Sequence, residues 1–207
     1  SSLYALKIAC DLLADRTVDA MVVGAVNACD NLFLHMGFTA LGALSKSGVS
    51  RPFSRRADGL LPAEGAAAVV LVRASDVAQA KNTVHGLIRG VGLSNDGKRR
   101  GLLAPDGDGQ REAIARAYAA AGVEPATVSL MECHATGTPG GDPIEIEGLG
   151  KVFAGRDDLP IGSLKSNTGH LITAAGLGGL LKLLGALAHE TAPATLHADD
   201  PIPMFAN

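Results

Sequence analysis

The 207-residue sequence contains no tryptophan and only three cysteines, and its charges nearly cancel. An odd number of cysteines in a chain of this size argues against a disulfide framework and favours a reducing, cytoplasmic compartment. The net charge of −3 and the isoelectric point near 6.0 provide no basic surface of the kind that binds nucleic acid. We therefore expect neither a disulfide-rich secreted domain nor a nucleic-acid partner.

Sequence patterns of metal and dinucleotide sites are also lacking. No two of the six histidines have ligand spacing on one predicted element, so we expect no metal. The run Asp106–Gln110 hints at a calcium loop, but Arg111 and Ala117 occupy the positions that require glycine and glutamate. Gly176–Gly179 lies inside a predicted helix and not between a strand and a helix, which excludes a dinucleotide loop.

Long hydrophobic runs are equally scarce. The longest, Leu171–Ala188, is interrupted by Lys182 and contains Gly176, Gly178 and Gly179, which suits a buried core helix better than a membrane span. A glycine inside a helix costs about 1 kcal/mol relative to alanine, so we expect another backbone to pack very close to this helix. The given sequence does not begin with methionine or with the charged region and cleavage site of a signal peptide, and we expect it to be one piece of a longer polypeptide.

The sequence does contain alternating helix and strand patterns, which are typical of an α/β fold. Apolar residues at helical spacing predict a helix over Ser1–Arg16, and the continuous apolar run Ala20–Val26 predicts a buried parallel strand. The other predicted elements are strands at Ala66–Val72 and Thr83–Val91, a short helix at Ser75–Ala80, a helix at Gln110–Ala121 and a surface loop at Arg51–Gly59.

Residues suited to chemistry gather between positions 128 and 170. The strand-like run Val128–Cys133 gives way to small, turn-forming residues, which places His134 just past the carboxyl end of a strand, where sites in open α/β sheets lie. Asp142 before Pro143 predicts the N-cap of a helix that carries Glu145 in its first turn. A carboxylate at that position is also where a structural cap belongs.

A second predicted strand, Pro160–Leu164, leads to Lys165 and His170, and the long apolar helix begins at about Leu171. We therefore expect His170 at a helix N-terminus, where the helix dipole and the nearby Lys165 ammonium disfavour a charged imidazole. A neutral imidazole donates a hydrogen bond without first losing a proton. Two such donors would stabilise an oxyanion or an enolate.

Two segments of this region resemble the HGTGTxxGDPxE and GSxKSNxGH signatures of β-ketoacyl synthases. They are His134-Ala-Thr-Gly-Thr-Pro-Gly-Gly-Asp-Pro-Ile-Glu145 and Gly162-Ser-Leu-Lys-Ser-Asn-Thr-Gly-His170. The resemblance covers essentially the whole chain and points to ketosynthase domains of modular polyketide and polyunsaturated-fatty-acid synthases. It implies a thiolase-like αβαβα sandwich, of which residues 1–207 form a single ketosynthase fragment: the tail of the first half and most of the second.

The reaction implied by the resemblance is a decarboxylative Claisen condensation of an enzyme-bound acyl group with a malonyl-type thioester on an acyl carrier protein. The site residues that it implies are the enolate donors His134 and His170, their supports Lys165 and Glu145, and the substrate-binding residues Thr136 and Thr138. The nucleophilic cysteine would lie two residues before Ser1, outside this sequence. The resemblance also implies a homodimer and no cofactor, since phosphopantetheine arrives on the substrate.

The two residues on either side of His134 differ from the residues usual in the family. Ala135 stands where the family usually has glycine, and alanine would be strained there if the position required a positive φ. Cys133 adjoins His134, but neighbouring residues on a strand point to opposite faces, so we expect Cys133 to have a packing role.

Other members of the same superfamily offer alternative functions. A chain-length-factor-like scaffold would bind carrier protein and dimerise without catalysis, and a decarboxylase would keep both histidines but lack the cysteine. A cysteine–histidine hydrolase is less favoured, because His170 at a helix N-terminus is poorly placed to become a cation. The residue two before Ser1 decides between the first two alternatives and a condensing enzyme, and the sequence leaves acyl length, extender unit and product open.

Overall fold

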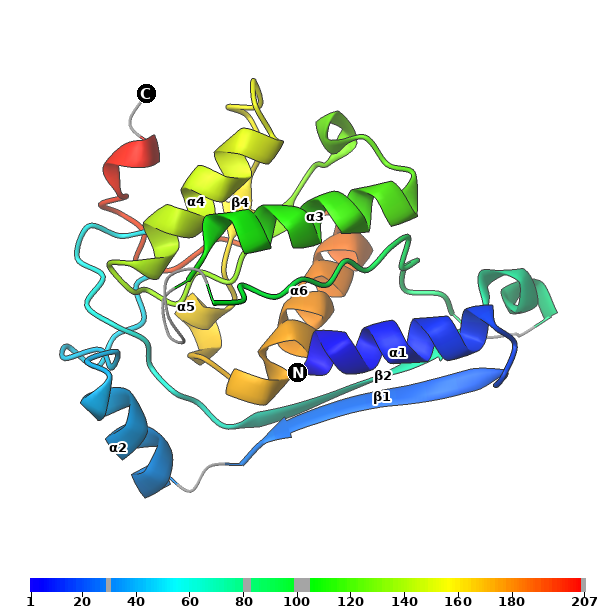
Figure 1. The fold of residues 1–207 in the computed structure, drawn as a ribbon, viewed down its shortest axis with the longest axis horizontal. Coiled ribbons are helices and arrows are strands. Elements are labelled where there is room, and N and C mark those ends of the chain that lie inside the picture. The colour runs from blue at the N-terminus through cyan, green and yellow to red at the C-terminus, as the bar shows by residue number, and fades with distance from the viewer. Residues whose placement is uncertain (29–30, 80–82, 99–104, 206–207) are drawn as a thin grey trace.

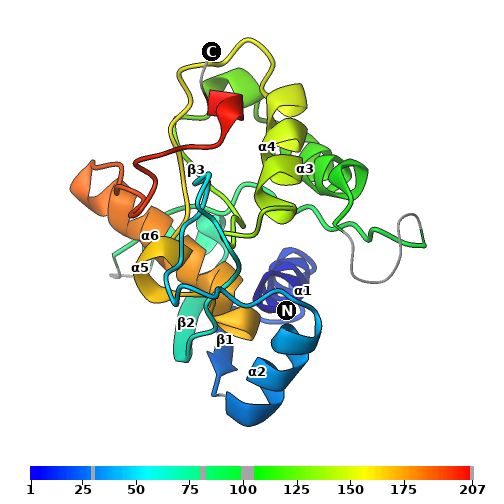
Figure 2. The ribbon, with the colours of Figure 1, turned by 90° about the vertical axis from the view of Figure 1, so that its left-hand side faces the viewer.

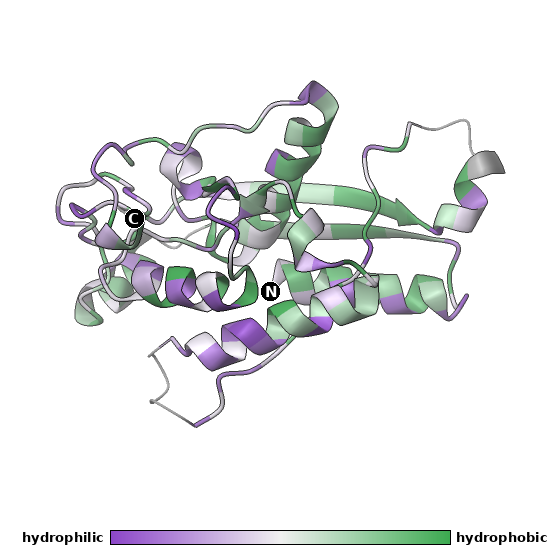
Figure 3. Ribbon diagram, turned by 90° about the horizontal axis from the view of Figure 1, so that it is seen from above, coloured by the Kyte–Doolittle hydropathy of each residue, from purple (hydrophilic) through white to green (hydrophobic). Residues whose placement is uncertain are grey.

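The computed structural model describes residues 1–28, 31–79, 83–98 and 105–205. Two short, continuous apolar runs form the two longest strands, β1 (Ala20–Asn27) and β2 (Gly65–Val72), which Figure 3 shows as hydrophobic along most of their length. They pair antiparallel, from Ala20 opposite Val72 to Asn27 opposite Gly65. The prediction of a buried parallel strand at Ala20–Val26 is therefore wrong. One face of this strand is exposed, because none of the described residues covers it.

The second sheet is short and parallel. It consists of β3 (Met131–Glu132) and β4 (Ile161–Gly162), which pair residue by residue. The α-helices are α1 (Ser2–Ala14), α2 (Asn31–Ala40), α3 (Gly107–Ala121), α4 (Gly141–Val152), α5 (Lys165–Thr168) and α6 (Ala175–His189). The 3₁₀ helices are η1 (Ala74–Gln79), η2 (Pro125–Thr127), η3 (Ile172–Ala174) and η4 (Pro203–Phe205).

The elements stack in alternating layers (Figures 1 and 2). Helix α6 contacts β2 on one side and β3 on the other, so it lies between the two sheets, and α1 lies beside it against β1. Helices α3 and α4 pack together and cover the other face of β3 and β4. The order helix, sheet, helix, sheet reproduces four successive layers of the αβαβα sandwich expected from the sequence.

Two apolar cores fill the spaces between these layers. One joins α1 and α6 to β1 through Leu6, Ala9, Val23 and Leu177. The other joins β3 to α3 and α4, and its buried members are Phe53, Cys133, Ala135, Ile146, Leu149, Phe153 and Ile202. The packing role expected for Cys133 is confirmed. The residues on both sides of His134 are thus anchored in this second core.

The segment Thr83–Val91 has no regular secondary structure, so the strand predicted there is wrong. An apolar run alone does not specify a pairing partner. Just beyond it, the chain passes so close to α3 that a Cβ atom on Gly92 would lie 1.9 Å from the carbonyl oxygen of Ala113. The helix predicted at Gln110–Ala121 is confirmed, with a start three residues earlier and Asp106 as its N-cap.

The long apolar helix is confirmed with later bounds than expected, because η3 precedes it. By length and composition alone, Ile172–His189 would be able to cross a membrane. Core helices of globular proteins pass the same test, and here the helix packs against α1, β2 and β3. The stretch is therefore no evidence of a membrane. Its glycines lie close to neighbours, but these neighbours are side chains and not the backbone that was expected: a Cβ on Gly176 would lie 2.6 Å from Cγ of Leu3.

We predict that Gly92→Ala destabilises the chain by about 1–3 kcal/mol, because the added methyl group must displace the backbone of α3. Gly150→Ala is the matched control, since its methyl group enters open space on α4 and alanine favours a helix by about 1 kcal/mol. Urea denaturation measures both. Equal effects of the two substitutions would contradict the close packing of this segment on α3.

Candidate functional site

His134 lies just past the end of β3, as predicted, and the turn that carries it is held by Glu145. The two carboxylate oxygens of Glu145 accept hydrogen bonds from the backbone N–H groups of His134 and Ala135, both at 2.7 Å. Glu145 therefore neither caps its own helix nor makes a hydrogen bond to Lys165. Burial raises the pKa of the Glu145 carboxyl, although these two hydrogen bonds act in the opposite direction.

Asp142 was expected to be the N-cap of α4, and that prediction is wrong, because the helix begins at Gly141 and is preceded by Gly140. The Asp142 side chain is 2% exposed and points into the protein. Its carboxylate accepts backbone N–H groups at 2.9–3.3 Å, from Phe53, Thr136, Gly137 and Thr138. These buried donors need an acceptor that the chain does not provide locally, and Asp142 supplies it.

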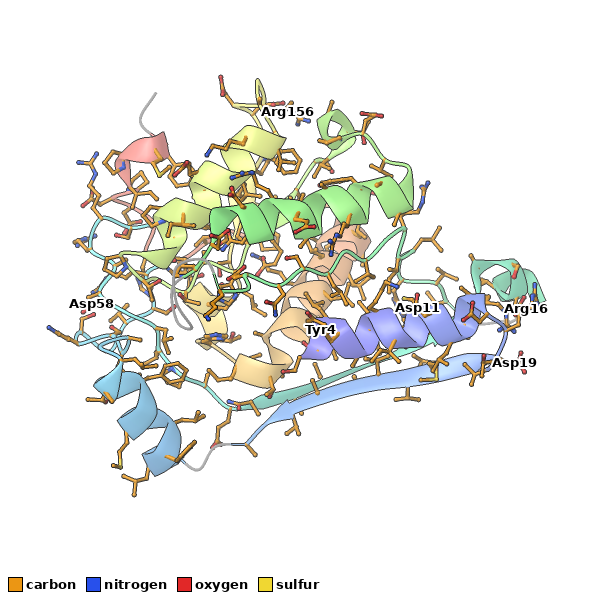
Figure 4. All side chains as sticks on the ribbon, viewed as in Figure 1. Tyr4, Asp11, Arg16, Asp19, Asp58 and Arg156 are labelled. Atoms are coloured by element: carbon orange, nitrogen blue, oxygen red, sulfur yellow. The ribbon has the colours of Figure 1, made fainter. Side chains whose placement is uncertain are left out.

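The segment Arg51–Gly59 is a loop, as predicted, with Arg55 and Arg56 exposed, but Phe53, Ser54 and Gly59 are buried, and the segment packs against this turn. The Gly59 N–H donates to the carbonyl oxygen of Gly137 at 2.9 Å. At the outer end of the segment, Asp58, labelled in Figure 4, accepts a hydrogen bond from the Ser45 hydroxyl at 2.6 Å. The segment therefore forms one wall of the site.

His170 does not lie at the N-terminus of the long helix, so that expectation is wrong. It pairs with Pro62 in a β-bridge, and its backbone N–H donates to the Leu61 carbonyl oxygen at 2.7 Å. Its Nδ1 accepts the N–H of Ile172 at 3.1 Å. Since Nδ1 is an acceptor, the proton of the neutral ring is on Nε2, which is left as a donor.

The two histidines meet across the site. The centroids of the His134 and His170 rings lie 5.4 Å apart, with the rings nearly perpendicular. Desolvation by the surrounding protein, and then the charge of Lys165, lowers the pKa of His134 to about 4 and that of His170 to about 3. His134 is nevertheless an exposed residue by surface area, whereas His170 is half-buried, so the desolvation of His170 is the more secure of the two. The neutral state expected for His170 is confirmed, but burial and not a helix dipole is its main cause.

Lys165 is the first residue of α5 and is 7% exposed. Burial lowers the pKa of its ammonium, and nearby carboxylates, led by Glu145 and Glu132, oppose that shift. The preceding Ser163 is fully buried, and its hydroxyl donates to the carbonyl oxygen of Ala135 at 2.9 Å. Ser163 thereby joins the loop of Lys165 to the turn of His134, a role that the sequence analysis did not identify.

The remaining predicted residues surround the turn. The hydroxyl oxygens of Thr136 and Thr138 lie 3.2 Å apart, and Thr138 borders a cavity of about 260 Å³ that also touches Arg55. Ala135 does not have a positive φ, so the strain considered for it is absent. Burial raises the pKa of the Cys133 thiol, which agrees with its packing role. Among the described residues, no three metal-binding side chains form a group.

A buried ion pair behind the site was not recognised in the sequence. Lys182 Nζ and Glu132 Oε2 lie 2.7 Å apart, and their side chains are 6% and 10% exposed. Lys182 was visible only as an interruption of the long apolar run. A charged residue in such a run is itself a sign of a buried partner, because an unpaired buried charge is costly.

Two family models match the chain. The model described as beta-ketoacyl synthase, N-terminal domain, matches residues 1–77, and the model described as beta-ketoacyl synthase, C-terminal domain, matches residues 85–199. The chain is 39% identical over 211 residues to a polyunsaturated fatty acid synthase of Thraustochytrium sp., covering 99% of the chain and 8% of that relative. It is 38% identical over 205 residues to pikromycin polyketide synthase component PikAIII of Streptomyces venezuelae, covering 97% and 13%.

Solved structures agree with these matches. The chain superposes on the ketosynthase from module 6 of the bacillaene synthase from Bacillus subtilis 168 with a TM-score of 0.94 and 36% identity. The match covers 99% of this chain and 38% of that one. The likeness confirms the predicted thiolase-like α/β fold, of which this chain forms a part. The chain spans only a small part of the length of the curated relatives.

We predict that the free energy of unfolding decreases as the pH falls from about 6.5 toward 5. The unfolded chain then takes up protons on imidazoles that the folded state keeps neutral at His134 and His170. Each such group contributes a slope of at most about 1.4 kcal/mol per pH unit. Denaturation at several pH values should show a smaller slope in His170→Gln. An identical slope in the variant and the wild type would contradict the assignment.

Asp142→Asn should destabilise the chain by about 2–4 kcal/mol. The amide has only one acceptor oxygen, and its NH₂ group would face backbone N–H donors that need an acceptor. Asp157→Asn, an exposed aspartate, is the control and should change stability by less than about 0.5 kcal/mol. Chemical denaturation compares the two. Similar small losses in both variants would show that the buried carboxylate does not hold the turn.

Proposed function

We propose that this chain, which belongs to the β-ketoacyl synthase family, provides the enolate-stabilising site of a condensing ketosynthase within a larger synthase. One observation supports this most directly: two histidines whose pKa values are lowered face each other beside a buried lysine. Neutral imidazoles are hydrogen-bond donors that do not need to lose a proton before they meet a developing negative charge.

In the proposed reaction, a malonyl-type carrier thioester loses carbon dioxide, and the electrons of the broken C–C bond form an enolate. His134 and His170 donate hydrogen bonds to the enolate oxygen, and His170 does so through Nε2, because Nδ1 is occupied by Ile172. The enolate carbon then attacks the carbonyl carbon of an acyl group carried on an enzyme thiol. The C–S bond breaks, the electron pair returns to sulfur, and the β-ketoacyl carrier thioester is released.

Lys165 and Glu145 support the two donors in different ways. Lys165 is a nearby cation that disfavours protonation of both imidazoles, and Glu145 fixes the backbone of the His134 turn. Thr136 and Thr138 are proposed to contact the thioester arm. Thr138 borders the cavity beside the turn, although neither histidine lines that cavity. We further propose a nucleophilic cysteine two residues before Ser1, which makes the domain an acyltransferase.

The partners and setting follow from the same proposal. The carrier protein brings phosphopantetheine with the substrate, so the domain itself needs no cofactor or metal. We place the domain in the cytoplasm, where its thiols stay reduced, and propose that it forms a homodimer. A non-condensing scaffold is less favoured, because a protein without catalysis has no need for two neutral histidines around Lys165.

We expect the synthase that contains this chain to become acylated just before Ser1 and to release carbon dioxide from malonyl carrier protein. His134→Ala or His170→Ala should lower carbon dioxide release by about 10²–10³-fold, because each removes a donor to the enolate oxygen. His189→Ala, at the exposed end of α6, is the control and should leave the rate unchanged.

Mass spectrometry of the peptide that spans Ser1 and the residues before it, together with measurement of released carbon dioxide, distinguishes a condensing enzyme from a decarboxylase and from a scaffold. Release without acylation would make the protein a decarboxylase, and the absence of both would favour the scaffold. Full activity in both histidine variants would contradict the proposed roles of His134 and His170.

A further inference from the structure

The ion pair between Glu132 and Lys182 is built into the fold behind the histidines. Glu132 is the last residue of β3, two residues before His134, and Lys182 comes from the middle of α6. Their charged atoms lie 2.7 Å apart, and both side chains are nine-tenths or more buried. A buried ion pair contributes little to stability on average, because the desolvation of two charges offsets their attraction. Its presence next to a reactive site therefore suggests a further role.

Glu132 also reaches the loop that carries Lys165. While Oε2 of Glu132 binds Lys182, Oε1 accepts the backbone N–H of Leu164 at 2.6 Å. Leu164 is the N-cap of the short helix α5, and Lys165 is its first residue. A continuous set of contacts therefore runs from α6 through the end of β3 to the backbone that places the Lys165 side chain.

Two glycines leave room for the pair. A Cβ atom on Gly179 would lie 3.0 Å from Cγ of Glu132, and a Cβ on Gly162 would lie 3.0 Å from Nζ of Lys182. Glycine inside a helix is unfavourable by about 1 kcal/mol relative to alanine, yet Gly179 occupies α6 at this point. The backbone is thus shaped around these two side chains.

We propose that Glu132 and Lys182 are positioning residues of the condensation reaction. Glu132 fixes the Leu164–Lys165 junction and directs a negative charge toward the Lys165 ammonium, and Lys182 holds Glu132 in place. This inference rests on the proposed function. It assigns the pair no contact with the substrate, because Glu132 acts through Lys165.

Several charged or titratable groups face Lys165 from the elements around it. They are Glu145 and Asp142 from α4, Glu132 and Cys133 from β3 and the residue after it, and the imidazoles of His134 and His170. Glu145 and Glu132 are the two largest favourable influences on the charged form of Lys165. Loss of the Glu132 charge should therefore lower the pKa of Lys165, and the neutral amine would appear at a lower pH.

The decisive variant is Glu132→Gln with Lys182→Met, made in the intact synthase. Glutamine keeps an acceptor for the Leu164 N–H, and methionine removes the charge that would otherwise be left unpaired. Carbon dioxide release from malonyl carrier protein is measured against pH. We expect the alkaline limb of the profile to move to lower pH, although the loss of the Lys182 cation partly opposes the shift that the loss of the Glu132 charge produces.

Glu147→Gln with Lys151→Met is the matched control. It removes the same charges from an exposed pair on α4, at 2.5 Å, and should leave the profile unchanged. If the wild type is active, two outcomes would overturn the inference. One is an unshifted alkaline limb of the pH profile in the double variant at Glu132 and Lys182, and the other is an equal shift in the control. An inactive wild type would instead refute the proposed function, and the inference would fail with it.

A second variant tests the position of the residue-132 carboxylate without removing its charge. It is informative even if the double variant fails to fold. Glu132→Asp keeps the negative charge but withdraws the carboxylate from the Leu164 N–H by one methylene group. We expect the rate of carbon dioxide release to fall about tenfold, while the alkaline limb of its pH profile stays at the wild-type pH. Wild-type rates in this variant would overturn the positioning role.

Discussion

Five successive backbone N–H groups, from His134 to Thr138, donate to only two carboxylates, those of Glu145 and Asp142. A run of N–H groups pointing inward is a natural anion site, and here the protein's own side chains occupy it. Because both carboxylates come from α4, the helix and the turn behave as one unit. The position of His134, the wall formed by the segment around Phe53, and the cavity beside Thr138 all depend on this arrangement.

Burial is the main influence on the pKa values of the ionisable groups in the site. His134 and His170 are kept neutral mainly because the surrounding protein desolvates them, and Lys165 adds to the effect. Lys165 is itself buried and depends on carboxylates from two elements to keep its charge. A site of this kind combines neutral donors with one buried ammonium group. That combination suits the stabilisation of a negative charge that exists only briefly.

Part of this could be predicted from sequence because the signal was local. The apolar run before His134 placed it at a strand end, and the glycines of α6 indicated close packing. The wrong predictions concern residues whose hydrogen-bond partners come from a segment far away in the sequence. Asp142 had the pattern of a helix cap, but the N–H of Phe53, 89 residues away, lies within its reach. His170 preceded an apolar helix, yet its pairing with Pro62 and the intervening η3 gave it another environment.

The contacts that hold η3 and α6, which follow His170, join segments that are far apart in sequence. The Ser2 hydroxyl accepts the N–H of Leu177 across 175 residues, and Thr173 donates to the carbonyl oxygen of Val26 across 147. Folding slows as contacting residues become more distant, because the entropy of loop closure must be paid before the contact forms. These two contacts close very long loops, so we expect the docking of η3 and α6 onto β1 and α1 to be among the slower steps of folding.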